Sequence, residues 1–381
     1  MEILNWYKSN FESGLKGRYT CLDFIIPILQ EYEKNTDWKI STAGYSEKGK
    51  AIPVISIGTG SFKILAWSQM HGNENTTTKA LFDLFSLLNN KKIFQNEIQQ
   101  ILKKCTFVVI PILNPDGAEK YTRHNANKID LNRDANNLTQ SESVALRNIY
   151  NEFKPDLCLN LHDQRSIYGL KATNKPATVS FLAPAADKER SITKERKAAM
   201  KYIAMLHCVL KPHILGQIGR YDDSYNENCV GDTFQSLGTP TILFEAGHCI
   251  NDYTREKTRK YIFLAYWSLL LHVSGLEQSK NNYKDYFKIP ENSNNFRDII
   301  LREVLIENKT KPVDIAVQFQ EVLQNNKIIF KATIDEIDDL QHLQAYREYT
   351  INEENFPNLK KVDKFYTLIE IEEFISIEFN F

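Results

Sequence analysis

Apolar runs typical of buried strands alternate with segments of helical periodicity along most of the chain. Runs of β-branched and aromatic residues predict strands over residues 53–57, 63–70, 106–112, 156–161, 178–182 and 241–244. Apolar residues at helical spacing predict helices over residues 22–32, 76–88, 188–210 and 254–271. This alternation predicts an α/β fold in which helices pack on a mostly parallel or mixed sheet.

The pattern changes near residue 280. Polar, linker-like stretches occupy residues 279–282 and 291–295. Strand-like runs then follow, over residues 298–306, 314–320, 328–334 and 365–374. Because few helical signals remain there, we expect two domains, a larger one over residues 1–278 and a small β-rich one over residues 290–381.

Composition and charge exclude several classes of protein. The 381 residues carry a net charge of −1, so no strong field favours nucleic acid or an anionic membrane as a partner. No apolar run reaches the ~18 residues of a membrane span, and the first residues lack the pattern of a signal peptide. The six cysteines are scattered, which favours reduced thiols over a disulfide framework. We therefore expect a cytoplasmic protein that binds neither nucleic acid nor membranes.

The first candidate functional segment lies between a predicted strand and a predicted helix, at residues 68–75. His71 and Glu74 are three residues apart, so both side chains can face the same way on a helical turn. An imidazole and a carboxylate that converge on one point suit Zn²⁺. Taken alone, the pair fits a solvated helix N-terminus stabilised by a glutamate better than a metal site, because such a spacing occurs often by chance.

The second candidate is the segment that follows the predicted strand at 106–112. The sequence Asn114-Pro115-Asp116-Gly117 predicts a turn. Arg123 and Arg133 lie just beyond it, among several asparagines. Arginine suits the bidentate capture of a carboxylate, because its planar donors match the two oxygens. Alone, the segment could also be an ordinary surface loop with solvated arginines.

Two more strand ends carry polar residues. His162 ends the predicted strand at 156–161, and Glu245 ends the one at 241–244. His162 alone reads as an ordinary sheet-edge residue, and it gains weight because a His/Glu pair needs a third metal ligand. A glutamate is costly to bury unpaired, so Glu245 is either a salt-bridged strand end or a general base acting on water.

In this order, the segments resemble the zinc carboxypeptidases, the family of the pancreatic carboxypeptidases and their bacterial relatives. The resemblance covers roughly residues 40–275. It implies a three-layer α/β/α sandwich around a mixed, mainly parallel, eight-stranded sheet. The motifs that carry it are His71-Gly72-Asn73-Glu74, Asn114-Pro115-Asp116-Gly117, Arg123-x-Asn125, Asp130-Leu131-Asn132-Arg133, the strand-end His162 and the strand-end Glu245.

The resemblance also implies a metal site and a reaction. His71, Glu74 and His162 would bind one zinc ion per chain, with the fourth position left to water. Glu245 would take the proton of that water and later pass it to the leaving amine. The protein would then be a metallocarboxypeptidase, which hydrolyses the C-terminal peptide bond of a peptide substrate.

Further residues would bind that substrate. By resemblance, Arg123 polarises the scissile carbonyl, and Asn132 and Arg133 bind the free C-terminal carboxylate. Family members usually have a tyrosine upstream of the catalytic glutamate that covers the substrate. Tyr221 and Tyr225 both lie near the expected place, and counting back from the Gly-Asp pair at 231–232 favours Tyr225.

A rival interpretation is a zinc amidohydrolase of the aspartoacylase and succinylglutamate desuccinylase type. Such enzymes share the zinc-ligand pattern and the Asp-Leu-Asn-Arg motif, and they hydrolyse small acylated amino acids. The turn at 114–117 and the Arg123-His124-Asn125 segment favour the carboxypeptidase. A carboxypeptidase acting on cell-wall peptides, and a catalytically inactive binding module, are further alternatives. The inactive module is disfavoured because Glu245 and all three ligands are present.

Overall fold

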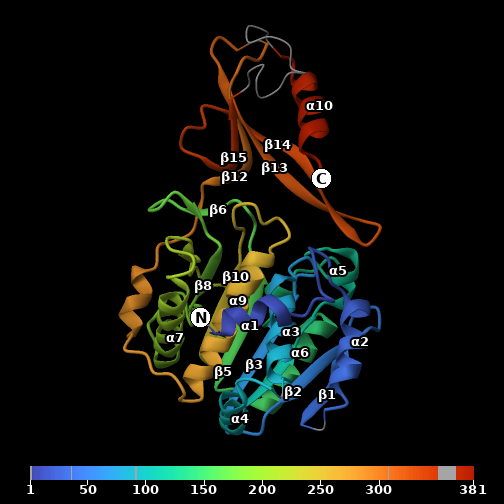
Figure 1. Ribbon diagram of the computed structural model, residues 1–381, viewed down its shortest axis with the longest axis vertical. Helices are drawn as coiled ribbons and strands as arrows, with labels where there is room; N and C mark the ends of the chain where they lie inside the picture. The colour runs from blue at the N-terminus through green and yellow to red at the C-terminus, as the bar shows by residue number, and fades with distance from the viewer. Residues whose placement is uncertain (1, 36, 91, 308, 351–365) are drawn as a thin grey trace.

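The computed structural model contains a large sheet and a smaller sheet toward opposite ends of the long axis (Figure 1). It describes residues 2–35, 37–90, 92–307, 309–350 and 366–381. The large sheet has eight strands, in the spatial order β1 (Trp38–Tyr45), β2 (Ala51–Ile57), β4 (Cys105–Ile110), β3 (Phe62–Ser68), β5 (Leu157–Asp163), β10 (Thr241–Ala246), β8 (Val179–Leu182) and β9 (Ile218–Arg220).

The large sheet is mixed, with a parallel centre. Strands β4, β3, β5 and β10 pair in parallel, as do β8 and β9. The pairs β1–β2, β2–β4 and β10–β8 are antiparallel. All seven residues of β5 are buried, as expected for a strand covered on both faces. The predicted α/β class and the mixed eight-stranded sheet are confirmed.

Helices cover both faces of this sheet, which gives three layers. The helices on one face contribute to the largest apolar cluster, which includes Ile64 and Leu159 from the strands. These helices are α1 (Glu2–Asn10), α2 (Leu22–Tyr32), α3 (Thr76–Leu88), α4 (Gln95–Lys104), α7 (Lys194–Leu210) and α9 (Glu256–Val273). On the opposite face, α6 (Ser141–Phe153) and α8 (Val230–Ser236) pack on Leu65 and Cys158. Because side chains alternate along a strand, Cys158 and Leu159 belong to opposite layers.

The C-terminal region forms a separate four-stranded sheet, as the strand-like runs predicted. Its spatial order is β14 (Lys327–Asp338), β13 (Val313–Gln324), β12 (Phe296–Val304) and β15 (Gln344–Thr350). A short 3₁₀ helix, η2 (Tyr283–Lys288), precedes it, and a small sheet joins β11 (Ser293–Asn294) to β6 (Tyr168–Leu170) and β7 (Lys175–Pro176). We retain the division into domains 1–278 and 290–381 as a proposal.

The predicted strand at 365–374 is wrong, since residues 368–379 form the helix α10 (Leu368–Phe379). Thr367 begins the helix as a capping box with Glu370. Ile371, Phe374 and Ile375 then recur at helical spacing and pack on the four-stranded sheet. The isoleucine-rich composition suggested a strand, but the spacing of the buried residues is that of a helix. Residue 365 itself lies outside the described residues.

A buried ion pair joins α3 to α9 beneath the N-terminal segment. Arg259 donates from Nε and Nη2 to the two carboxylate oxygens of Asp83, at 2.7 and 2.6 Å, and both side chains are fully buried. The hydroxyl of Tyr7 and the backbone N–H of Glu12 donate to the same carboxylate, at 3.1 and 2.8 Å. Asp83 therefore fixes the N-terminal segment against two helices of the core.

We expect Asp83→Asn to lower the free energy of unfolding by about 3 kcal/mol, the low end for breaking a buried pair, because it leaves the buried Arg259 guanidinium with only the partly exposed Glu256, at 3.1 Å, as a counter-charge. Urea-induced unfolding followed by circular dichroism measures the change. Glu31→Gln is the control, because Glu31 pairs with Lys34 on the surface and exposed pairs contribute little. A loss as small as that of the control would show that the buried pair does not stabilise this interface.

Candidate active site

The parallel strands β3, β5 and β10 end at the same edge of the large sheet. His162 lies near the end of β5, and its register partner across the parallel pair with β10 is Glu245. The segment that leaves β3 carries His71 and Glu74 before α3 begins at Thr76. Polar residues from three separate parts of the sequence therefore meet at one edge, where open α/β sheets bind ligands.

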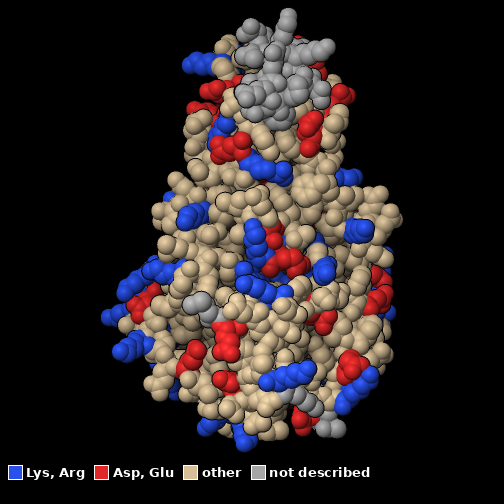
Figure 2. Space-filling model, in the orientation of Figure 1, with Lys and Arg blue, Asp and Glu red and all other residues tan. Residues whose placement is uncertain are grey.

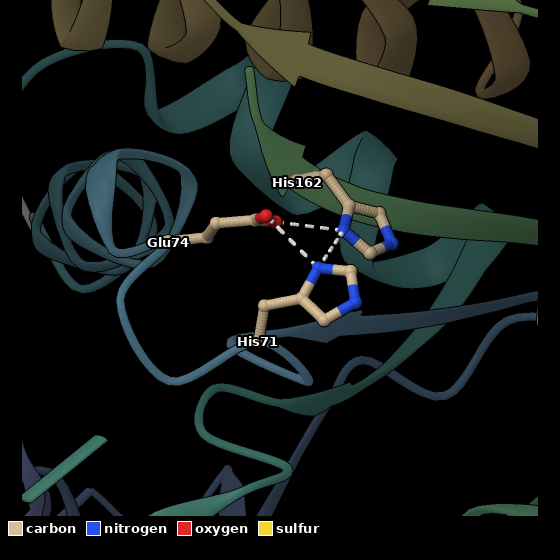
Figure 3. Close-up of side chains that lie close together, drawn as sticks. All are labelled: His71, Glu74 and His162. Atoms are coloured by element: carbon tan, nitrogen blue, oxygen red, sulfur yellow. Dashed lines mark hydrogen bonds and ion pairs between the residues drawn. The ribbon is translucent and has the colours of Figure 1, made fainter. Parts of the chain in front are cut away.

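His71, Glu74 and His162 point toward a common centre (Figure 3). His71 Nδ1 lies 2.9 Å from Glu74 Oε1, and His162 Nδ1 lies 2.8 Å from Glu74 Oε2. The two Nδ1 atoms are 3.1 Å apart. One potential ligand atom from each of the three residues lies within 4.8 Å of the other two. Two imidazole nitrogens and a carboxylate in this arrangement suit a zinc ion.

Asp130 orients one of the histidines. His71 Nε2 donates to Asp130 Oδ1 at 3.0 Å, which leaves Nδ1 directed at the centre of the cluster. The second oxygen of Asp130 accepts from Nε of Arg123 at 3.1 Å. Such carboxylate–histidine pairs fix the tautomer and the ring orientation of metal ligands. The sequence analysis gave Asp130 no role, although it begins the Asp-Leu-Asn-Arg motif.

Two sequence motifs pack directly on each other behind His71. A Cβ atom on Gly72 would lie 2.0 Å from the carbonyl carbon of Gly117, so only glycine permits this approach of the two backbones. Asn114 caps the short helix α5 (Pro115–Lys120) through Gly117 N–H, at 2.8 Å. Its Nδ2 also donates to the carbonyl of Met70 at 3.1 Å. The Asn-Pro-Asp-Gly turn therefore holds the segment that carries His71.

Burial and neighbouring charge set the protonation states of the cluster. Burial lowers the pKa of His162, which favours the neutral imidazole that a metal requires. Burial opposes ionisation of Glu74, but the two histidines outweigh it and hold the pKa of this carboxyl well below its usual range. Burial, together with the charges of Glu74 and Asp163, raises the pKa of Glu245 well above its ordinary value. The pKa values of the two neighbouring glutamates, Glu74 and Glu245, are therefore shifted in opposite directions.

The residues fit a metal site with an open position. In the part of the chain that the structure describes, Glu245 Oε2 and His162 Nε2 are buried without a hydrogen-bond partner. An unpaired buried carboxylate oxygen is costly unless water, an ion or a ligand completes it. An acceptor of this kind beside a His-Glu-His cluster is what a catalytic zinc site with a water position requires.

A cleft of about 560 Å³ opens over the cluster. Every site residue that the sequence analysis named lines this cleft: His71, Glu74, Arg123, Asn132, Arg133, His162, Tyr221, Tyr225 and Glu245. The structure thus brings all of them to one place.

The two candidate arginines differ in their partners. Arg123 pairs with Asp130 at 3.0 Å and reaches Glu74 Oε1 at 3.4 Å, so it is directed toward the metal cluster. Arg133 is exposed, and its Nη1 donates to the carbonyl of Asn132 at 2.6 Å. No carboxylate pairs with Arg133 among the described residues. Asn132 accepts the N–H of Val230 through Oδ1 at 3.0 Å, which ties it to the start of α8.

The two tyrosines lie on one segment of the cleft wall. The hydroxyl of Tyr221 donates to the hydroxyl of Tyr168 at 2.8 Å, and burial, with the charge of Glu245, raises its pKa. Tyr225 is half-buried in the same wall. Both side chains reach the cleft, so the geometry does not choose between them as the residue that covers a substrate.

A further carboxylate in the wall, Asp232, served in the sequence analysis only as a landmark. It accepts the N–H of Asn226 at 2.8 Å and so holds the end of the tyrosine-bearing segment. Burial raises its pKa to about 7. No metal motif includes it, and its position in the cleft follows from where α8 begins.

Comparisons with known proteins agree with this geometry. Residues 22–159 match the family model described as zinc carboxypeptidase. Probable carboxypeptidase 2 of Arthroderma benhamiae is 26% identical over 128 residues, which are 31% of this chain and 24% of that protein. Carboxypeptidase 2 of Trichophyton rubrum is 26% identical over 148 residues, or 36% and 27% of the two chains. This chain therefore matches only about a quarter of the length of these curated relatives.

Solved structures share the fold of the larger domain. The metallo-carboxypeptidase from Burkholderia cenocepacia has a TM-score of 0.56 at 14% identity, covering 68% of this chain and 70% of that one. Carboxypeptidase A from Helicoverpa armigera has a TM-score of 0.52 at 14% identity, covering 72% and 80%. The match of residues 22–159 to the family model agrees with the ordered motifs, and the solved structures show that the larger domain has the fold of these carboxypeptidases.

Proposed function

We propose that the protein is a zinc-dependent metallocarboxypeptidase that hydrolyses the C-terminal peptide bond of a peptide. The observation that carries the proposal is the composition of one cleft. It contains a His-Glu-His cluster, and two further groups that lack a partner among the described residues: Oε2 of the buried Glu245 has no hydrogen-bond donor, and Arg133 has no carboxylate. These are a metal site, a base and an acceptor for a substrate carboxylate, in a domain of the matching family.

His71, Glu74 and His162 would hold one zinc ion per chain. A zinc ion there would supply a Lewis acid and would lower the pKa of a coordinated water. Glu245 would accept a proton from the attacking water at its unpaired Oε2, and would then donate that proton to the leaving amine as the peptide C–N bond breaks. Its raised pKa supports the second step, because such a carboxyl holds the proton until the leaving amine takes it.

The two arginines would act at different points of the substrate. Arg123, directed at the metal cluster by Asp130, would stabilise the negative charge that develops on the scissile carbonyl oxygen. Arg133, with the amide of Asn132, would bind the terminal carboxylate, which supports exopeptidase action over internal cleavage. Tyr221 or Tyr225 would cover the bound residue from the opposite wall.

The binding partners of the protein and its location in the cell stay predictions. Acidic and basic side chains are interspersed on the face shown in Figure 2, which supports a peptide and not a nucleic acid as partner. Among the described residues, no helix combines the length and the apolar character that a membrane span requires. All six cysteines are free, which supports the proposed cytoplasmic location.

We expect His162→Ala to reduce bound zinc from about one ion per chain to a small fraction, because it removes one of three protein ligands. Metal analysis of the purified variant measures the loss. His213→Ala is the matched control, since His213 is exposed and lies outside the cleft. Zinc retained at the wild-type level in His162→Ala would remove His162 from the metal site.

We expect Glu245→Gln to keep its zinc but to lower turnover by at least ~10²-fold, the low end for loss of a general base. The amide has the same shape and cannot accept the proton. Zinc content and peptide hydrolysis are measured on the same preparation. Glu227→Gln, an exposed change outside the cleft, should leave both unchanged. Wild-type turnover in Glu245→Gln would assign the proton transfer to another group.

Amidating the C-terminus of a peptide should lower kcat/KM at least ~10-fold. The neutral amide loses charge-assisted hydrogen bonds to Arg133, each worth about 1.5–3 kcal/mol, and about 1.4 kcal/mol corresponds to tenfold. Hydrolysis of one peptide with free and amidated ends is compared in wild type, Arg133→Ala and Arg123→Ala. Arg133→Ala should erode the preference together with activity, whereas Arg123→Ala should mainly lower kcat.

Arg165→Ala is the control for that comparison, because it removes another exposed arginine from the same cleft. We expect it to keep the preference for a free terminus. Equal rates on both peptides in wild type would contradict the carboxypeptidase. An enzyme that hydrolyses only small acylated amino acids would favour the amidohydrolase instead.

A further inference from the structure

The β13–β14 hairpin of the four-stranded sheet extends toward α5 of the larger domain (Figure 1). Glu321 of β13 makes the contact there. Its two carboxylate oxygens each accept from Nη2 of Arg18, at 3.0 Å, and one of them also accepts from the hydroxyl of Tyr121. The side chain of Arg18 is only 4% exposed, so this ion pair is largely removed from water.

Arg18 also bonds a residue next to the His-Glu-His cluster. Its Nη1 donates to Asp163 Oδ2 at 3.2 Å. Asp163 directly follows His162 in β5, and its own backbone N–H donates to Glu74 Oε2 at 3.2 Å. The residue after the second histidine is therefore bonded to the carboxylate that lies between the two histidines.

Asp163 also fixes the helix that follows Glu74. Its carboxylate accepts the N–H groups of Thr76 and Thr77, the first two residues of α3, at 3.0 and 3.3 Å. A carboxylate stabilises a helix N-terminus in this position. Both chain segments that supply metal ligands thus depend on where the Asp163 side chain lies, and Arg18 holds that side chain.

Charge makes Glu321 necessary to this arrangement. A guanidinium does not release its proton in a protein, so Arg18 stays charged when its partners change. Asp163 is shared, because Nη1 of Arg255 lies 3.7 Å from it. Without Glu321, two buried cations would face one carboxylate, and Arg18 would lose both bonds that fix its Nη2.

The same sheet holds the other side of this segment. Ser166 accepts from the hydroxyl of Tyr346 through its carbonyl at 2.8 Å, and its hydroxyl donates to Asp298 at 3.2 Å. Gln318 of β13 donates to the Ser166 hydroxyl at 2.6 Å. The residues after His162 are therefore bonded to the four-stranded sheet at more than one point.

We propose that the C-terminal sheet is a positioning part of the metal site, in which Glu321 holds Arg18 and Arg18 holds Asp163 between the two ligand-bearing segments. The inference rests on the metal site of the proposed function. It gives the C-terminal sheet a role in the larger domain that the sequence alone did not indicate.

The test measures zinc affinity on the full chain by competition with a chelator, after the metal has been removed. Glu321→Gln should raise the zinc Kd about tenfold, the low end for loss of a partner that orients ligands. Arg18→Gln should raise it at least as much. The double variant should bind zinc no more weakly than Arg18→Gln alone, because Glu321 acts through Arg18.

Asp314→Asn is the matched control. Asp314 lies in the same strand and pairs with Arg302 at 2.7 Å, and within the described part of the chain all its hydrogen bonds go to residues of the C-terminal region. It should lower the thermal stability of the sheet and leave the zinc Kd unchanged. Equal weakening by Asp314→Asn would overturn the proposal, since it would show a general loosening.

Tyr121→Phe is a milder variant that removes one donor to Glu321 and keeps every charge. It should raise the zinc Kd about threefold, and it decides the question if Glu321→Gln does not fold. Wild-type affinity in Glu321→Gln, or in Tyr121→Phe where only that variant folds, overturns this inference alone. A wild-type protein that binds no zinc would overturn the proposed function as well, so the two failures are distinct.

Discussion

The parallel pairing of β3, β5 and β10 is the constraint on which the site depends. It brings three strand ends to one edge of the sheet, and it sets Glu245 opposite His162 in register. A shift of one residue would turn Glu245 to the other face, because side chains alternate along a strand. The fully buried, apolar bodies of these strands fix that register. Hydrophobic packing of the strands, away from the candidate active site, therefore decides where the polar side chains meet.

The edge has an electrostatic cost that the surrounding arginines offset. Glu74, Glu245 and Asp163 are buried close together, and their mutual repulsion contributes to the raised pKa of Glu245. Arg123 lies on one side of this group and Arg18 on the other. Arginine suits these positions because it stays charged when buried and forms several directed bonds. Glu74, whose pKa is lowered, keeps its negative charge between the two histidines, where the proposed metal ion would be bound.

The sequence predicted the parts of this site that lie within short segments. His71 and Glu74 share one turn, and His162 and Glu245 end apolar strands, so local pattern marked them as candidates and the order of the motifs along the chain selected them. Contacts between distant segments were not predictable in this way. Arg18 and Glu321 are 303 residues apart, and neither belongs to a motif. The helix α10 was missed for a different reason: its isoleucines favour strands by composition, whereas its buried residues follow helical spacing.

The segment after His162 adds contacts of this chain's own to the shared fold. The motifs that carry the family resemblance supply the His-Glu-His cluster, Glu245 and the two arginines, and all of them lie in the larger domain. Asp163 directly follows His162, and its side chain bonds residues from three other parts of the chain. Asp163 joins β5 to α3 and accepts from Nη1 of Arg18, whose Nη2 donates to Glu321 of the C-terminal sheet. A single buried carboxylate next to a metal ligand thus links the metal cluster to the C-terminal sheet.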